Sequence, residues 1–110
     1  MNMSTTQAQP WSFTIEFDKD KAARNGYDLD TLYDYVGRNV ERYGLTRLAA
    51  GTWKAKAGRE VESQCHALLM LSHAKWVMQN VKSLTAFEND TDAIDCIEVL
   101  RRRNPKLLHA

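Results

Sequence analysis

Residues 12–18 have the sequence SFTIEFD, in which apolar and polar side chains alternate. One side of the run carries Phe13, Ile15 and Phe17, and the other carries Thr14, Glu16 and Asp18. Successive side chains of a β-strand point to opposite faces of its sheet, so this alternation predicts a strand whose apolar face lies on the core. The strand ends at the carboxylate of Asp18, whose meaning depends on what the fold places beside it.

The composition is typical of one globular domain built around a single core. The chain has 110 residues, of which 44% are hydrophobic and 26% are charged, and this argues against a largely disordered or collagen-like protein. The net charge of +1 gives no overall attraction to nucleic acid. Binding of nucleic acid would therefore need a local basic patch.

Targeting signals and metal-ligand spacings are missing from the sequence. No apolar run is long enough for a membrane-spanning helix, and residues 1–10 lack the basic start and apolar centre of a secretory signal. We therefore expect a cytoplasmic protein without a membrane partner, with residues 1–10 as a disordered tail and residues 11–110 as a single domain. Cys65 and Cys96 are expected to be reduced thiols rather than a disulfide or zinc ligands.

The remaining chain divides into alternating helices and strands. A stripe of apolar residues at helical spacing covers 29–43, where Asp28 or Asp30 can cap the helix and Gly44 can end it. Before this helix we expect a polar loop over 19–27, and after it strands over 45–48 and 52–57, a helix over 60–75 and a strand over 81–87. Residues 92–103 are expected to form either a short helix capped by Asp92 or a fifth strand. The helix over 60–75 is expected to bury an apolar face of Val61, Cys65, Leu68, Leu69 and Trp76.

This order of elements predicts an α+β fold of the ferredoxin-like βαββαβ type. Right-handed crossovers and short hairpins would give a four-stranded antiparallel sheet of order 4-1-3-2, two helices on one of its faces, and a short C-terminal element. The first strand is then central and antiparallel to both neighbours. We expect the end of that strand, at Asp18, to lie beside Thr52 and Ser83 at the starts of the third and fourth strands.

In this order and spacing the chain resembles the virulence-associated protein D family, relatives of the small ferredoxin-like nuclease of CRISPR adaptation. The resemblance covers roughly residues 12 to 100. It depends on FTIEFD at 13–18 as a first strand ending in Phe-Asp, on RYGLTRLAAGTW at 42–53, on AKW at 74–76, and on VKSLTAFENDTD at 81–92 as a fourth strand followed by acidic residues.

The resemblance implies a homodimeric, toxin-type endoribonuclease that cleaves RNA, with an antitoxin protein as a further partner. It assigns Asp18 as metal ligand or general base, with Thr52 and Ser83 beside it, and a divalent cation such as Mg²⁺ as cofactor. A symmetric dimer would bring two copies of Asp18 across one groove to share the metal. The family places an Asp early in the fourth strand, where this chain has Ser83; Glu16 is the carboxylate that could substitute.

Each candidate residue also has a purely structural explanation. Asp18 can be a solvated strand end, in which case the chain is a non-catalytic module that binds protein or nucleic acid through the same surface. His66 and His73 are too far apart along one helix to share a metal ion and are expected to face solvent. Two further sets each allow two explanations. Trp76 and Met78 can belong to the core or a dimer interface, or they can form a platform on which bases stack. Arg101, Arg102, Arg103 and Lys106 can form a phosphate site or a basic helix end.

Overall fold

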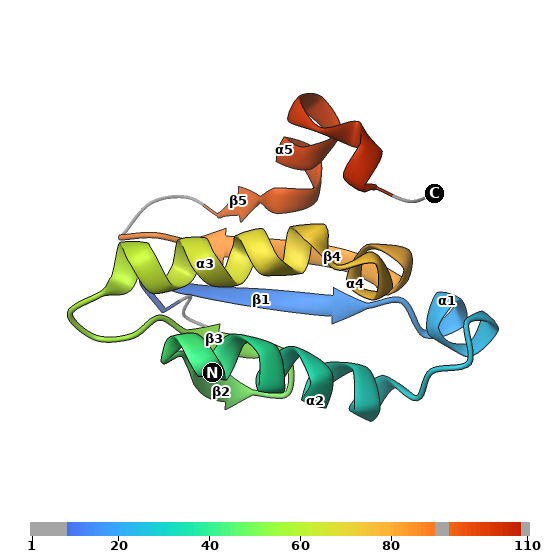
Figure 1. Cartoon of the computed structure of the whole chain (residues 1–110), viewed down its shortest axis with the longest axis horizontal. Helices are drawn as coiled ribbons and strands as arrows, with labels where there is room; N and C mark the ends of the chain where they lie inside the picture. The colour runs from blue at the N-terminus through green and yellow to red at the C-terminus, as the bar shows by residue number, and fades with distance from the viewer. Residues whose placement is uncertain (1–8, 90–92, 109–110) are drawn as a thin grey trace, which may run out of the picture.

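The computed structural model describes residues 9–89 and 93–108 and has an α+β architecture. Within these residues, five strands form one antiparallel sheet in the order β2-β3-β1-β4-β5 (Figure 1). The strands are β1 (Ser12–Phe17), β2 (Thr46–Ala49), β3 (Thr52–Lys54), β4 (Val81–Phe87) and β5 (Ile94–Asp95). The order of the first four strands is the predicted one, but the prediction of a four-stranded sheet is wrong because β5 adds to the outer edge of β4.

Five helices and two short 3-10 turns accompany the sheet in the described residues. They are α1 (Lys19–Arg24), α2 (Leu29–Val40), η1 (Glu41–Tyr43), α3 (Glu60–His73), α4 (Lys75–Asn80), α5 (Cys96–Arg103) and η2 (Pro105–Leu107). The two long predicted helices are present. The first is continued by η1, which Gly44 ends in the left-handed region at φ 95°. The polar loop predicted for residues 19–27 is wrong, because residues 19–24 form a helix that Asp18 caps.

The C-terminal segment combines both structures that the sequence allowed. Residues 94–95 pair with β4, and α5 follows at once. Asp95 caps α5 by accepting a hydrogen bond from the backbone N–H of Glu98. The predicted cap, Asp92, and the predicted disordered residues 1–8 lie outside the described residues. Gln9 and Pro10 already contact the domain, since their carbonyl oxygens accept hydrogen bonds from Ser12 Oγ and Lys54 Nζ.

The core lies between the apolar side of the sheet and the helices. Phe13 and Ile15 of β1 are buried, as the alternation predicts, and Trp53 of β3 and Leu84 of β4 flank them. Helices α2 and α3 complete the same cluster with Leu32, Val36, Val40, Ala67 and Leu71. Figure 1 shows α2 and α3 running alongside the central strands, with β5 and α5 standing apart at one edge.

Helix α3 buries a different face from the predicted one. Its buried residues are Ser63, Gln64, Ala67 and Leu71, whereas Val61 and Leu69 are 59% and 60% exposed. Small and polar side chains let the helix approach the sheet closely, and Gln64 Nε2 donates hydrogen bonds to the carbonyl oxygens of Ser12 and Phe87. The predicted apolar face of this helix is therefore largely an outer surface. Trp76 does pack on the core, but it belongs to α4.

The turn between β2 and β3 brings Gly51 against β1. The backbone N–H of Ile15 donates to the carbonyl oxygen of Gly51 at 2.8 Å. A Cβ atom at position 51 would clash with the Ile15 carbonyl oxygen and approach the Tyr33 ring to 3.0 Å. Only glycine lets the hairpin reach the central strand here.

We expect Gly51→Ala to lower the free energy of unfolding by about 1 to 3 kcal/mol, the usual cost of overpacking a well-packed site. For a domain of this size that corresponds to a fall of at least about 4 °C in the melting temperature, measured by circular dichroism. Ala50→Ser, an exposed neighbour on the same turn, is the control and should melt like the wild type. Equal melting of Gly51→Ala and wild type would contradict this explanation of the close approach.

Candidate functional site on the polar side of β1

The polar side of β1 carries three side chains that point away from the core. Thr14 and Glu16 alternate with the buried residues of the strand. Asp18 continues the alternation, because its backbone is still extended at φ −79° and ψ 121°. Adjacent members of this row are separated by about 6.6 Å along the strand, two residues at about 3.3 Å each. We call Thr14, Glu16 and Asp18 the β1 polar row.

The structure places Thr52 and Ser83 beside the first two members of the row rather than beside Asp18. Thr52 pairs with Thr14, and their hydroxyl oxygens are 2.9 Å apart. Ser83 pairs with Glu16 and donates a hydrogen bond to its Oε1 at 3.1 Å. Thr52 is consequently about 13 Å along the strand from Asp18, four residues at about 3.3 Å each. The predicted convergence of the three residues at one point is wrong.

A bulge between β1 and β4 explains the position of Ser83. The register shifts after Glu16, so Phe17 pairs with Val81 and Lys82 is the extra residue on β4. The residue whose backbone lies beside Asp18 is Asn80, whose carbonyl oxygen accepts from the Asp18 N–H at 2.8 Å. A carboxylate at position 83 would therefore lie beside Glu16.

Asp18 is the N-cap of α1. Its Oδ1 accepts hydrogen bonds from the backbone N–H groups of Asp20 and Lys21, both at 2.9 Å. The bond from Lys21 is the largest cause that holds the pKa of Asp18 below its ordinary value, and the charges of Lys21 and Arg24 act in the same direction. The carboxylate is therefore ionised at neutral pH, which suits a cation ligand better than a general base. Among the described residues, the hydrogen bonds to this carboxylate all go to Oδ1.

Glu16 and Asp18 are the two carboxylates of the β1 polar row. Within residues 9–89 and 93–108, no group of three or more Asp, Glu, His or Cys side chains is placed to hold a metal ion. Mg²⁺ commonly binds one or two protein carboxylates and keeps several waters or substrate oxygens. Glu16 and Asp18 fit that ligand set, with the phosphate of a substrate and water completing the shell.

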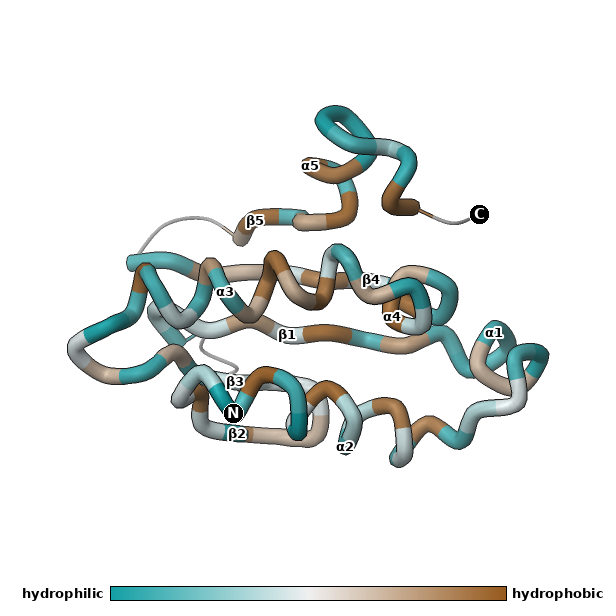
Figure 2. Tube along the Cα trace, in the orientation of Figure 1, coloured by the Kyte–Doolittle hydropathy of each residue, from teal (hydrophilic) through white to brown (hydrophobic). Residues whose placement is uncertain are grey.

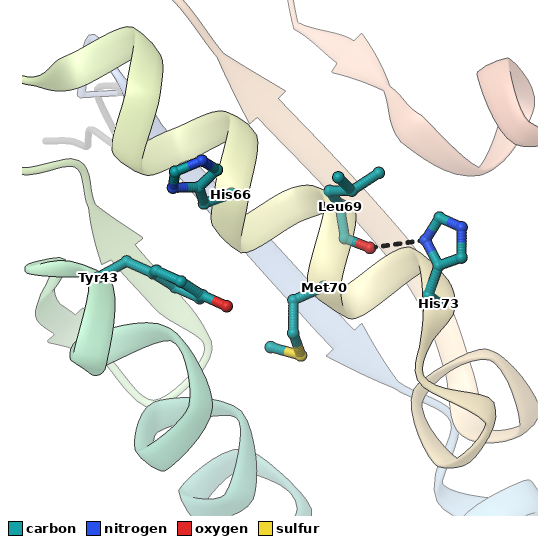
Figure 3. A pocket seen from close by; sticks show the side chains of 5 residues that line it. All are labelled: Tyr43, His66, Leu69, Met70 and His73. Atoms are coloured by element: carbon teal, nitrogen blue, oxygen red, sulfur yellow. Dashed lines mark hydrogen bonds between the residues drawn. The ribbon is translucent and has the colours of Figure 1, made fainter.

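A separate cavity of about 570 Å³ lies beside α3, lined by Tyr43, His66, Leu69, Met70 and His73 (Figure 3). The two histidines stand apart along the helix and are exposed, as predicted. His66 packs on the ring of Tyr43 at 5.5 Å between centroids, and His73 Nδ1 lies 3.0 Å from the Leu69 carbonyl oxygen. The sequence did not predict that Tyr43 lines this cavity, because the packing of η1 on α3 is a tertiary contact.

Trp53, Trp76 and Met78 have structural roles in the core. Trp53 is buried, and its indole N–H donates to Glu41 Oε2 at 3.0 Å. Met78 is buried and Trp76 packs partly buried on the core, as the first of the two explanations for that pair predicts. The basic end of α5 is exposed and hydrophilic (Figure 2), and Arg101 and Arg102 both pair with Glu98.

Comparisons with models of protein families, with curated proteins and with solved structures found no match to this chain. Among the described residues, no helix has the length and apolar character needed to cross a membrane. Cys65 and Cys96 are free, as predicted, and burial raises the pKa of the Cys96 thiol to about 11. The geometry of the site is therefore the basis for assigning a function.

The capping role of Asp18 predicts a pH-dependent contribution to stability. The folded pKa lies below the ordinary value of 3.8, so the stabilisation is present above that value and is lost as the pH falls through the folded pKa. Asn caps helices as well as Asp but carries no charge. We expect wild type to melt above Asp18→Asn at pH 7, and the difference to shrink as the pH is lowered from about 4 to about 2.

Thermal melts by circular dichroism across that pH range measure the difference. Asp20→Asn is the control, because Asp20 contributes only its backbone N–H to the cap. A difference between wild type and Asp18→Asn that does not change with pH would refute the link between cap and charge.

Proposed function

We propose that the chain is a toxin-type endoribonuclease, a relative of the virulence-associated protein D family, that cleaves RNA phosphodiester bonds at the β1 polar row. The observation that carries the proposal is the pair of solvent-accessible carboxylates, Glu16 and Asp18, on the polar side of the central strand. The sheet order of the first four strands and the two long helices support a ferredoxin-like fold with β5 and α5 added to it.

The chemistry assigned to this site is electrostatic. Hydrolysis of a phosphodiester needs stabilisation of charge on the phosphate oxygens and activation of water or the adjacent 2′-hydroxyl. A bound Mg²⁺ would supply both, and Asp18 and Glu16 would hold it. The lowered pKa of Asp18 keeps its carboxylate charged for this purpose. Thr52 and Ser83 remain candidates for hydrogen bonds to RNA along the same side of the sheet.

The register of β4 gives Ser83 a different role in the proposed site. Position 83 lies opposite Glu16, so the carboxylate that the family pattern carries on the fourth strand has its counterpart in Glu16 itself. Ser83 then serves to orient that carboxylate through its hydrogen bond at 3.1 Å. The departure from the family pattern is compatible with activity on this basis.

A second function is favoured by the cap. The two backbone hydrogen bonds to Oδ1 account for an acidic residue at position 18 without any chemistry. On this alternative the chain is a non-catalytic module that binds nucleic acid or protein through the polar side of the sheet. Cleavage assays separate the two functions.

We expect Asp18→Asn and Glu16→Gln each to reduce RNA cleavage at least about a hundredfold, the scale of losing a metal ligand. Both variants keep the size of the side chain, and Asn keeps the cap, so folding should survive. Ser83→Asp adds a third carboxylate next to Glu16 and should raise activity or tighten the dependence on Mg²⁺. The assay follows cleavage of a mixed RNA with Mg²⁺ and with a chelator.

Asp20→Asn is the matched control, since it removes an exposed carboxylate next to the site without touching the β1 polar row. Circular dichroism verifies that each variant is folded. The nuclease would be rejected in favour of the binding module if wild type and Ser83→Asp were both inactive. The same conclusion would follow if Asp18→Asn cleaved RNA as fast as wild type.

The proposed enzyme acts as a homodimer, and an apolar outer surface supports this assembly. Leu69 of α3 and Val99 of α5 line one cavity of about 380 Å³ and are 60% and 41% exposed. Monomeric proteins rarely expose large contiguous apolar patches. We infer that a second copy of the chain covers this surface; an antitoxin protein would be a separate partner.

Light scattering at micromolar concentration should give a mass of about 25 kDa, twice the 12.6 kDa of one chain. Leu69→Glu places a charge in the apolar surface and should yield the monomer, whereas Gln79→Glu on α4 should not. A wild-type monomer at this concentration would refute the dimer through this surface.

A further inference from the structure

A second cavity, of about 330 Å³, lies between α1, α4, β4, α5 and the end of the described chain. Its lining combines three cationic side chains with four apolar ones: Lys21, Lys82 and Arg101 with Met78, Val81, Ile97 and Leu108. None of these described lining residues is acidic. The three cations come from three elements that are far apart in the sequence, so only the fold brings them together. We call this the basic cavity.

The charges of the basic cavity are only partly neutralised. Lys21 and Lys82 are exposed and form no ion pair with any residue that the structure describes. Arg101 shares Glu98 with Arg102, so two guanidinium groups balance one carboxylate. A cavity with this balance of charge favours an anion with several oxygen acceptors, and phosphate is the biological anion that such cationic groups bind best.

Two features of the backbone place the basic cavity next to the β1 polar row. Lys21 lies three residues after Asp18, within the same first turn of α1, where such residues are neighbours about 5 to 6 Å apart at Cβ. Lys82 is the extra residue of the β4 bulge and directly precedes Ser83, which hydrogen-bonds to Glu16. The backbone segments that carry Lys21 and Lys82 therefore flank the two carboxylates at one end of β1.

We propose that the basic cavity binds a phosphate of the RNA backbone next to the phosphodiester that the β1 polar row attacks. This inference rests on the proposed function and adds the substrate contact that it lacks. Lys21, Lys82 and Arg101 contact the phosphate oxygens, and the apolar lining, such as Ile97 and Leu108, packs against the attached ribose or base. The cavity positions the strand, and the carboxylates act on the neighbouring bond.

Binding is measured separately from cleavage, by fluorescence anisotropy of a labelled single-stranded RNA in a chelator, with gels to verify that the RNA stays intact. We expect the double variant Lys21→Gln, Lys82→Gln to bind at least about tenfold more weakly at 0.1 M salt. The slope of log affinity against log salt should fall by about 0.7, because the cavity neutralises one phosphate of the single strand. Arg101→Gln should weaken binding in the same direction.

The matched control is the double variant Lys56→Gln, Lys75→Gln, which removes the same charge from exposed lysines outside the cavity. It should bind RNA within about twofold of wild type. Equal losses of affinity in the two double variants would show attraction by net charge alone and overturn the proposal. Failure of wild type to bind RNA would overturn it as well.

Further measurements distinguish RNA from other sources of phosphate, and distinguish failure of the basic cavity from failure of the proposed nuclease. Vesicles of phosphatidylcholine with phosphatidylserine test binding of a lipid phosphate, and calorimetry with inorganic phosphate tests binding of a free anion. If either one binds through Lys21 and Lys82 and RNA does not bind, the RNA assignment is rejected. RNA binding that depends on the cavity in a protein that never cleaves RNA supports the cavity while the proposed nuclease fails. Asp18→Asn that binds RNA normally but does not cleave it supports both.

Discussion

The central position of β1 is the constraint on which the rest of the molecule depends. The strand pairs with β3 on one side and β4 on the other. Its backbone hydrogen-bonding groups are therefore occupied within the sheet, and only the side chains on its two faces are available for other contacts. Burial of Phe13 and Ile15 is worth about 1.5 to 3 kcal/mol for each side chain and fixes which face meets the helices. Glu16 and Asp18 are consequently held on the other face, because a slip of one residue would exchange the two sets.

Local irregularities then decide which residues meet the β1 polar row. The contact of Gly51 with Ile15 sets the height at which β3 begins, and this places Thr52 opposite Thr14. The β4 bulge sets Ser83 opposite Glu16 and turns Lys82 into the extra residue. A regular sheet would have brought other side chains to the end of β1. The site is thus determined by one turn and one bulge as much as by the strands themselves.

The strong periodicities of the sequence are enough to predict β1, α2 and the order of the first four strands. Periodicity fails for α3, whose apolar residues surround the helix, so that composition alone cannot tell the close-packed Ala67 side from the exposed Leu69 side. Helix α1 escapes prediction because six residues are too few to show a period. The positions of Thr52 and Ser83 depend on the register of β3 and β4 against β1. The sequence does not reveal this register, because it depends on the close approach of Gly51 and on the bulge in β4.

The cap of α1 joins the structural and the proposed chemical roles of Asp18. The backbone N–H groups that α1 directs at Oδ1 also stabilise the charge, so the interaction that starts the helix keeps the carboxylate ionised. The same turn carries Lys21 to the basic cavity. A carboxylate and a cation are therefore positioned by one short helix. Its orientation depends on the hydrogen bond from Asp18 N–H to the carbonyl oxygen of Asn80, the last residue of α4, which directly precedes β4. Because β4 also supplies Lys82, any movement of this strand relative to β1 would shift both sides of the proposed RNA site together.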